Sequence, residues 1–144
     1  MDKIDKYAEL FIATAELHGF TDIDYHRYSD NTGGEICFEY DRAGFSVQVY
    51  KDEGETVIDI SLVSLSMGEI RLEENDFTHF RFDRTAMFSD FSSIEEAVQD
   101  TILEIMSCTV QDTYAKIISR INSAKNNLSS DEFEEFVNLV KKFY

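Results

Sequence analysis

Acidic side chains recur at alternating positions in several β-branched and aromatic segments, which places them on one face of a predicted sheet. Carboxylates at positions i and i+2 of a strand lie roughly 6.5 Å apart and form a regular array of negative charge. Such an array can receive the basic side chains of a partner protein in place of nucleic-acid phosphates. Alternatively, these residues only solvate the sheet. The carboxylates expected on this face are Glu35, Glu39, Asp41, Asp59, Glu69 and Glu73.

The histidines and cysteines do not follow the spacing of a catalytic or metal-binding motif. His18, His26 and His79 are too far apart to form a helical ligand pair, and no Gly-x-Ser-x-Gly segment is present. Cys37 and Cys108 are isolated, without a Cys-x-x-Cys pair. We therefore expect no metal, no cofactor and no catalytic residue, and we interpret the protein as a non-enzyme.

The chain is strongly acidic along its whole length. It has 29 acidic and 13 basic residues, which gives a formal net charge of −16. This charge argues against direct binding to nucleic acid or to an anionic membrane, because both are negatively charged. It favours a basic protein partner, unless the acidity serves solubility alone.

Cysteine use and the hydropathy pattern favour a cytoplasmic protein. Two unpaired cysteines fit a reducing compartment. The first residues lack the basic start and apolar core of a signal peptide, and no apolar run approaches the ~20 residues of a membrane span. We expect a bacterial host cytosol, with a phage or mobile element as a candidate source.

The segment from residue 35 to residue 82 predicts the central sheet. Apolar residues alternate with polar ones near 36–40, 45–49, 57–63, 70–72 and 80–82, which indicates half-buried antiparallel strands. Glycine-containing turn signals at 31–34, 41–44, 51–54 and 66–68 separate these segments, and we expect the glycines to supply positive φ. Short connections predict a meander of about five strands, and residues 20–28 form either a further edge strand or an extended link.

Helical periodicity flanks the sheet on both sides. Residues 3–18 predict an amphipathic helix with Asp2 as its N-cap and Gly19 at its end. Residues 94–121 continue a helical pattern after a capping box at Ser93, with a kink or break expected near 107–110. Ser129 begins a last helix. The predicted fold class is α+β, in which one antiparallel sheet carries the N-terminal helix and two or three C-terminal helices on one face, within a single domain of residues 1–144.

A segment with large apolar side chains lies between the last predicted strand and the next helix. We predict that Thr85–Ser92 is a loop, in which Met87, Phe88 and Phe91 either join the core or form an apolar patch for a partner. The core interpretation is the favoured one.

These observations favour a small acidic inhibitor that binds a basic, nucleic-acid-binding protein, such as a nuclease of bacterial host defence. Inhibitors of the anti-CRISPR or anti-restriction type, including nucleic-acid mimics, often have this size and charge. An immunity protein or antitoxin directed against a toxin nuclease, or an acidic chaperone or adaptor, is the alternative. The oligomeric state is left open between monomer and homodimer.

Overall fold

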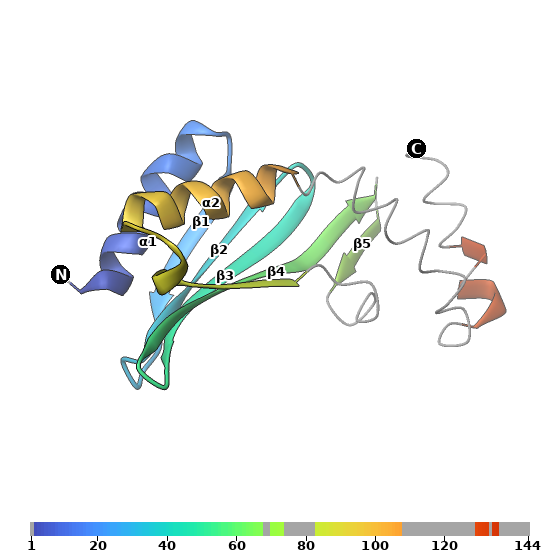
Figure 1. The fold of residues 1–144 in the computed structure, drawn as a ribbon. Helices are drawn as coiled ribbons and strands as arrows, with labels where there is room; N and C mark the ends of the chain where they lie inside the picture. Colours follow the sequence, from blue (N-terminus) through green and yellow to red (C-terminus); the bar gives the residue numbers. More distant parts are fainter. Residues whose placement is uncertain (1, 68–69, 74–82, 108–128, 133, 136–144) are drawn as a thin grey trace.

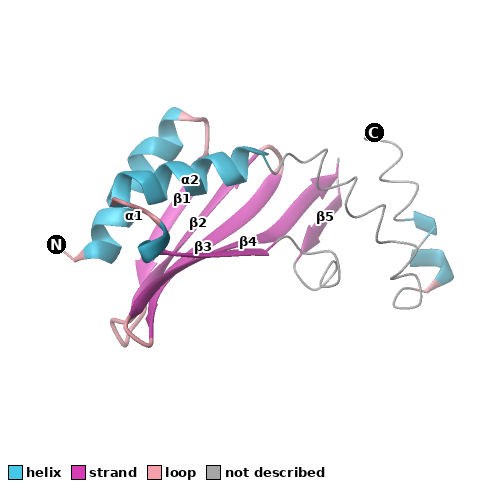
Figure 2. Ribbon diagram, in the orientation of Figure 1, coloured by secondary structure: helices cyan, strands magenta, loops and turns pink. Residues whose placement is uncertain are grey.

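The structure is a computed structural model that describes residues 2–67, 70–73, 83–107, 129–132 and 134–135. The described strands form one antiparallel sheet, and helices α1 and α2 cover one face of it (Figures 1 and 2). The predicted α+β arrangement is confirmed to this extent. Strand positions predicted at 77–82 and the predicted helix beyond residue 107 lie outside the described residues.

Helix α1 (Lys3–Leu17) begins where the sequence predicts. The Asp2 side chain accepts a hydrogen bond from the backbone N–H of Asp5 at 2.9 Å, and Gly19 follows the helix with φ of 82°. The helix is amphipathic, as predicted, and Leu17 lies outside its buried side with a side chain that is 86% exposed. The buried residues of α1 are Ile4, Tyr7, Ala8, Phe11 and Ala15.

The sheet has six described strands, whereas the sequence predicted about five. The order is β1 (Thr21–Arg27), β2 (Gly33–Tyr40), β3 (Ala43–Asp52), β4 (Glu55–Met67) and β5 (Ile70–Glu73), and β6 (Asp83–Met87) also pairs with β4. Strand β4 is long enough to hold both neighbours on one edge, with β6 beside its first half and β5 beside its end. The segment predicted as an edge strand or link is therefore the edge strand β1.

The segment predicted as a loop from Thr85 to Ser92 begins as a strand. Residues up to Met87 belong to β6, and Phe88–Asp90 form the short 3₁₀ helix η2. The pairing of Ala86 with Ile58 and of Thr85 with Asp59 explains the difference, because tertiary hydrogen bonding to β4 recruits a segment whose own sequence pattern is weak.

Helix α2 (Ile94–Ser107) packs beside α1 on the sheet. Ser93 caps it by accepting a hydrogen bond from the N–H of Glu96 at 3.1 Å, as predicted. The reciprocal half of the capping box is displaced by one residue, because the Glu96 carboxylate accepts from the backbone and hydroxyl of Ser92. Ser129 accepts likewise from the N–H of Glu132 at 3.2 Å, and residues 130–132 and 134–135 are helical.

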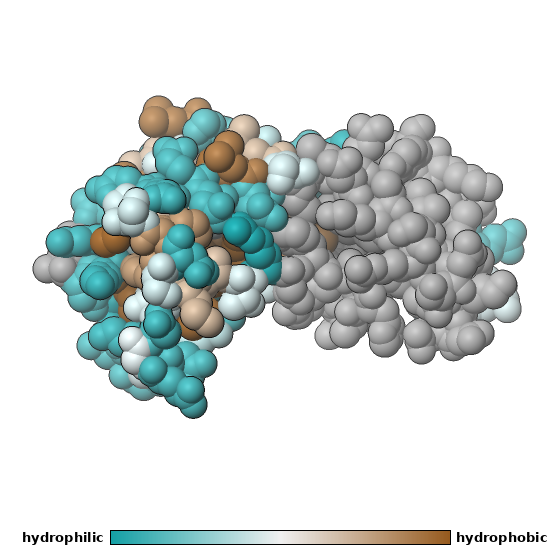
Figure 3. Space-filling view, in the orientation of Figure 1, coloured by the Kyte–Doolittle hydropathy of each residue, from teal (hydrophilic) through white to brown (hydrophobic). Residues whose placement is uncertain are grey.

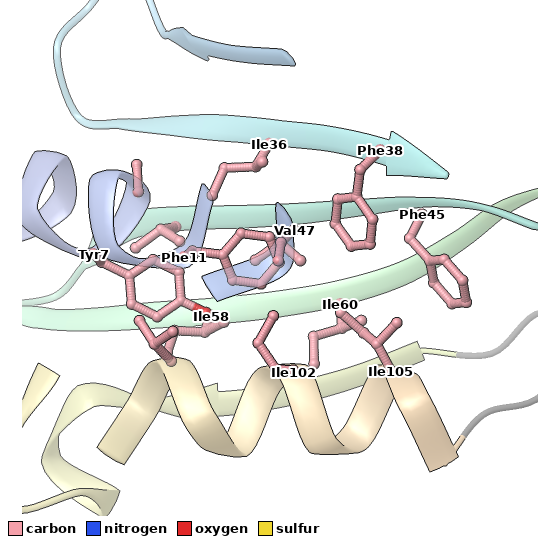
Figure 4. Packing of buried hydrophobic residues seen from close by; sticks show 14 of the residues in the cluster. Tyr7, Phe11, Ile36, Phe38, Phe45, Val47, Ile58, Ile60, Ile102 and Ile105 are labelled. Carbon is pink, nitrogen blue, oxygen red and sulfur yellow. The ribbon is translucent and has the colours of Figure 1, made fainter. Parts of the chain in front are cut away.

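The core lies between the sheet and the two helices. Figure 4 shows side chains from α1, α2 and strands β2, β3 and β4 converging in this layer. Burying one such large apolar side chain stabilises the fold by about 2 kcal/mol. The period-two alternation that predicted the strands is therefore explained by one buried face. The labelled residues are Tyr7, Phe11, Ile36, Phe38, Phe45, Val47, Ile58, Ile60, Ile102 and Ile105.

Two hairpin turns show where the glycine prediction succeeds and where it is wrong. In the β3–β4 turn, Glu53 and Gly54 have φ of 51° and 85°, as expected for a two-residue turn. In the β2–β3 turn, Asp41 and Arg42 take the positive values of 51° and 66° instead of Gly44. Gly44 lies within β3, where an added Cβ would stand 2.3 Å from the Ser64 hydroxyl. Close approach of β4, and not turn geometry, requires glycine there.

A candidate protein-binding face

The sheet surface opposite α1 and α2, here called the open face, is covered by neither described helix (Figure 1). Strand register places one residue from each of five neighbouring strands in a single row across it. Neighbouring strands lie about 4.8 Å apart, so adjacent residues of this row stand side by side on the face. The row consists of His26, Glu35, Gln48, Asp59 and Thr85.

Glu35 is held by neutral donors. Its Oε2 accepts hydrogen bonds from the Ser46 hydroxyl at 2.7 Å and from the Gln48 amide at 3.3 Å. Burial acts to raise the pKa of this carboxyl, but these hydrogen bonds outweigh it and hold the pKa below its usual value. The other oxygen, Oε1, lies 3.6 Å from Nε2 of His26. Glu35 is therefore a half-buried carboxylate whose orientation is fixed and whose charge is retained.

Asp59 is held in the same way on β4. Its Oδ2 accepts a hydrogen bond from the Tyr50 hydroxyl at 2.7 Å, and its Oδ1 accepts one from the Thr85 hydroxyl at 2.6 Å. The bond to Asp59 is the main reason that the pKa of Tyr50 rises to about 12, with burial adding to it. Asp59 thus joins β3 and β6 through side chains that carry no positive charge.

A second aromatic hydroxyl lies near the same carboxylates. Tyr28 follows β1, and its ring centroid lies 6.2 Å from that of His26 in an edge-on arrangement. Burial raises the pKa of Tyr28, and the negative charges of Glu35 and Asp59 add to the effect. The open face therefore combines carboxylates with aromatic rings.

Cys37 lies on the open face next to Glu35 but is not an activated nucleophile. Burial, followed by the charge of Glu35, raises the pKa of its thiol to about 11. At neutral pH the thiol is protonated. Within the described residues, no group of three or more His, Cys, Asp or Glu side chains is arranged to hold a metal ion.

On the helix side of the sheet, carboxylates pair with arginine. Arg27 contacts Asp2 at 3.1 Å and Asp5 at 3.3 Å, which ties β1 to the start of α1. Arg84 contacts Asp100 at 2.8 Å and Glu104 at 3.4 Å, which ties β6 to α2. In the part of the chain that the structure describes, neither Glu35 nor Asp59 forms such a pair with lysine or arginine. The negative charges of Glu35 and Asp59 are thus less neutralised than those of the carboxylates that pair with Arg27 and Arg84.

The structure brings together only part of the predicted carboxylate array. Glu35, Glu39 and Asp59 lie on strands β2 and β4 and share the open face by alternation. Asp41 does not, because it occupies the β2–β3 turn with φ of 51°, where an aspartate tolerates the left-handed conformation. Glu73 ends β5, and Glu69 lies outside the described residues.

The predicted apolar patch is divided by the structure. Phe88 and Phe91 pack against the core, and the ring of Phe88 lies 5.6 Å from that of Tyr7. Met87 is 41% exposed at the end of β6. These three residues therefore do not form one contiguous patch on the described surface.

Sequence reasoning missed the residues that surround the carboxylates on the open face. Ser46, Gln48 and Tyr50 alternate along β3 opposite the core residues. His26 does so on β1, and Tyr28 directly follows that strand. Their alternation with core residues, together with the register of the hairpins, would have identified them.

A shallow groove of about 350 Å³ lies between α1 and the start of α2, and charged Lys6, Glu9 and Glu95 flank its apolar residues Leu10, Ala13 and Ile94. The loops at the lower left of Figure 3, where the β1–β2 and β3–β4 connections meet, are hydrophilic. There the backbone N–H of Lys51 donates to the carbonyl of Thr32 at 3.0 Å.

Within the described residues, α1 and α2 both fall short of the length and apolarity that crossing a membrane requires. Comparisons with protein-family models, with curated proteins and with solved structures find no match for this chain.

Proposed function

We propose that this protein is a small acidic inhibitor, without catalytic activity, that binds a basic, nucleic-acid-binding protein through the open face of its sheet. A nuclease of bacterial host defence, met in the host cytosol, is the partner class that the charge favours. In this proposal the carboxylates occupy positions that substrate phosphates would otherwise take.

One observation carries the proposal, namely the way Glu35 and Asp59 are held. Hydroxyl and amide donors orient both carboxylates and leave their negative charge without a lysine or arginine partner in the described chain. A rigid, already oriented anionic surface loses little conformational entropy when a cationic partner binds. On the helix side, in contrast, Arg27 and Arg84 each pair with two carboxylates and offset part of their negative charge.

Electrostatics gives the proposal a characteristic signature. A net charge of −16 accelerates encounter with a basic protein, and added salt screens this attraction over a Debye length of about 10 Å at 0.1 M. The expected complex therefore forms fast and weakens with salt, and nucleic acid competes with it.

Two alternative functions remain, an immunity protein or antitoxin and a chaperone or adaptor. An immunity protein or antitoxin against a toxin nuclease would use the same face, so the identity of the captured nuclease distinguishes it. A chaperone or adaptor would use apolar residues instead. The packing of Phe88 and Phe91 against the core reduces the apolar surface available for that role.

The test compares two variants with equal change in charge. Glu35→Gln with Asp59→Asn removes two charges from the open face, and Glu9→Gln with Glu16→Gln removes two from the exposed side of α1. Partners are captured from bacterial lysate at low salt, identified by mass spectrometry and then purified. We expect the open-face variant to bind the purified partner about tenfold or more weakly, and the α1 variant to bind almost as wild type.

The proposal fails if the captured partner is indifferent to the open-face variant, or if DNA and RNA do not displace it. Capture that depends equally on both variants would indicate a nonspecific effect of net charge. Circular dichroism of each variant verifies that the fold is retained.

A further inference from the structure

We propose that a second copy of this chain docks at the free edge of β1 and forms a symmetric dimer in which the two sheets become one. This inference goes beyond the proposed function and does not rest on it, because the interface is a strand edge and both open faces stay uncovered. Antiparallel pairing relates the two copies by a two-fold axis perpendicular to the sheet, so both open faces lie on the same side of the dimer.

Strand β1 ends the sheet, and alternate backbone groups along it point away from β2. The N–H of Tyr28 donates to the carbonyl of Gly33 on β2 at 2.8 Å. Hydrogen bonding in an antiparallel pair alternates along the strand, so His26 also bonds to β2, whereas Tyr25 and Arg27 direct their N–H and C=O groups outward. In the part of the chain that the structure describes, β1 pairs with β2 alone. The outward groups can therefore hydrogen-bond to an added strand.

This edge lacks most of the features that protect edge strands from pairing. Strand β1 has seven residues, whereas β5 and β6 at the opposite edge of the described sheet have four and five. It contains neither lysine nor proline. A bulge interrupts the register between Thr21 and Asp24, and residues 24–27 continue in regular pairing. The second half of β1 thus remains a regular edge.

The sequence of β1 complements itself in one antiparallel register. When Tyr25 of each copy pairs with Tyr25 of the other, the outward backbone groups align, and Asp24 of each copy faces the exposed His26 of the other. A shift of two residues keeps the backbone groups aligned but places either the two Asp24 side chains or the two His26 side chains opposite each other. Opposite charges across neighbouring strands are stabilising and like charges are destabilising. Charge complementarity therefore selects the register centred on Tyr25.

Two apolar side chains beside this edge are only half-buried. Ile23 on β1 and Ile12 on α1 pack against the core without being fully covered. Ile12 follows Asp5 by about two helical turns, so both lie on one side of α1. That side faces β1, because the Asp5 carboxylate accepts a hydrogen bond from the Tyr25 hydroxyl at 2.8 Å. A strand added at β1 would remove apolar surface of both isoleucines from water.

The experiment measures dimerisation of the full chain by sedimentation equilibrium at one ionic strength, and we expect a reversible monomer–dimer equilibrium. Asp24→Lys places a cation opposite His26 in two symmetric pairs, so the dimer Kd should rise about tenfold or more. This change reduces the net charge of −16 by two units, so a nonspecific effect of charge would lower the Kd instead. Glu9→Lys makes the same charge change on the exposed side of α1 and should not raise the Kd.

Two further measurements locate the interface. Asp24→Lys combined with His26→Asp exchanges the paired charges and should restore a Kd close to that of wild type, and circular dichroism verifies the fold of each variant. Hydrogen exchange followed by NMR requires no substitution. The amides of Tyr25 and Arg27 should exchange more slowly as the protein concentration rises, whereas the His26 amide, which already bonds to β2, should change little.

Three outcomes would overturn this inference. The first is a protein that stays monomeric up to millimolar concentration. The second is a dimer whose Kd does not rise in Asp24→Lys, and the third is concentration-dependent protection of amides outside β1 only. None of these outcomes decides the proposed function, because its test depends on Glu35 and Asp59 and not on the edge of β1.

Discussion

The hydroxyl groups of Tyr7 and Thr101, 94 residues apart in the chain, lie 2.6 Å from each other in the buried seam between α1 and α2. The Thr101 hydroxyl also donates to the carbonyl of Ala97 at 2.9 Å, so its proton is used and Tyr7 is the donor in the pair. Burial raises the pKa of Tyr7, which keeps the phenol protonated. One hydrogen bond thus joins the N-terminal helix to the helix that follows the sheet.

This arrangement predicts unequal effects for two isosteric changes. Tyr7→Phe removes the donor, and the Thr101 hydroxyl keeps its bond to Ala97, so we expect a loss of about 1 kcal/mol in the free energy of unfolding. Thr101→Val leaves the buried Tyr7 hydroxyl without an acceptor, so we expect a larger loss of about 2 kcal/mol. Urea denaturation measures both. Equal losses, or the reverse order, would contradict the assignment of the donor.

The lowered pKa of Glu35 predicts a local response to Ser46→Ala. Burial, the largest influence on this carboxyl, is then opposed mainly by Gln48, so the pKa should rise. A lowered native pKa stabilises the fold above the ordinary value of 4.5, and this contribution disappears as the pH falls through the native value. NMR titration of the Glu35 side chain measures the shift, and Ser61→Ala is the control. An unchanged Glu35 pKa in Ser46→Ala would show that the hydroxyl does not hold it.

The Tyr50–Asp59 hydrogen bond predicts a separate transition at alkaline pH. Tyr50 should ionise near pH 12, and Asp59→Asn should bring its pKa back toward the ordinary value of 10. Because the native pKa is raised, the stabilisation is complete below pH 10 and is lost as the pH rises toward 12. Ultraviolet difference titration against Tyr50→Phe isolates this residue. A Tyr50 that ionises at the ordinary value in wild type would refute the hydrogen bond.

The β2–β3 turn predicts a stabilising substitution. Arg42 has φ of 66°, a conformation that disfavours residues with a Cβ, and Gly54 fills the equivalent position of the β3–β4 turn. Arg42→Gly should therefore raise the free energy of unfolding by about 1 kcal/mol. Arg42→Ala removes the same charge but keeps the Cβ, so it should give no comparable gain. Thermal or urea unfolding of wild type, Arg42→Gly and Arg42→Ala measures these differences in stability. Equal stability of the glycine and alanine variants would refute the explanation.

The sequence alone determined the features that depend on local periodicity. One apolar face per strand is needed to build a core, so Ile36, Phe38 and Val47 predicted the buried side of β2 and β3 correctly. The first helix and the caps at Asp2 and Ser93 were equally visible, because capping depends on residues within one turn of the helix.

Tertiary pairing decided which residues meet on the open face. Glu35 was visible as an outward carboxylate, but its hydrogen bonds to Ser46 and Gln48 follow from the β2–β3 register. The recruitment of Thr85 to Asp59 likewise required β6 to pair with β4 across 26 residues of chain. Sequence spacing carries the period of a strand but not the identity of its neighbour, so the acidic character of the surface was predictable and its internal arrangement was not.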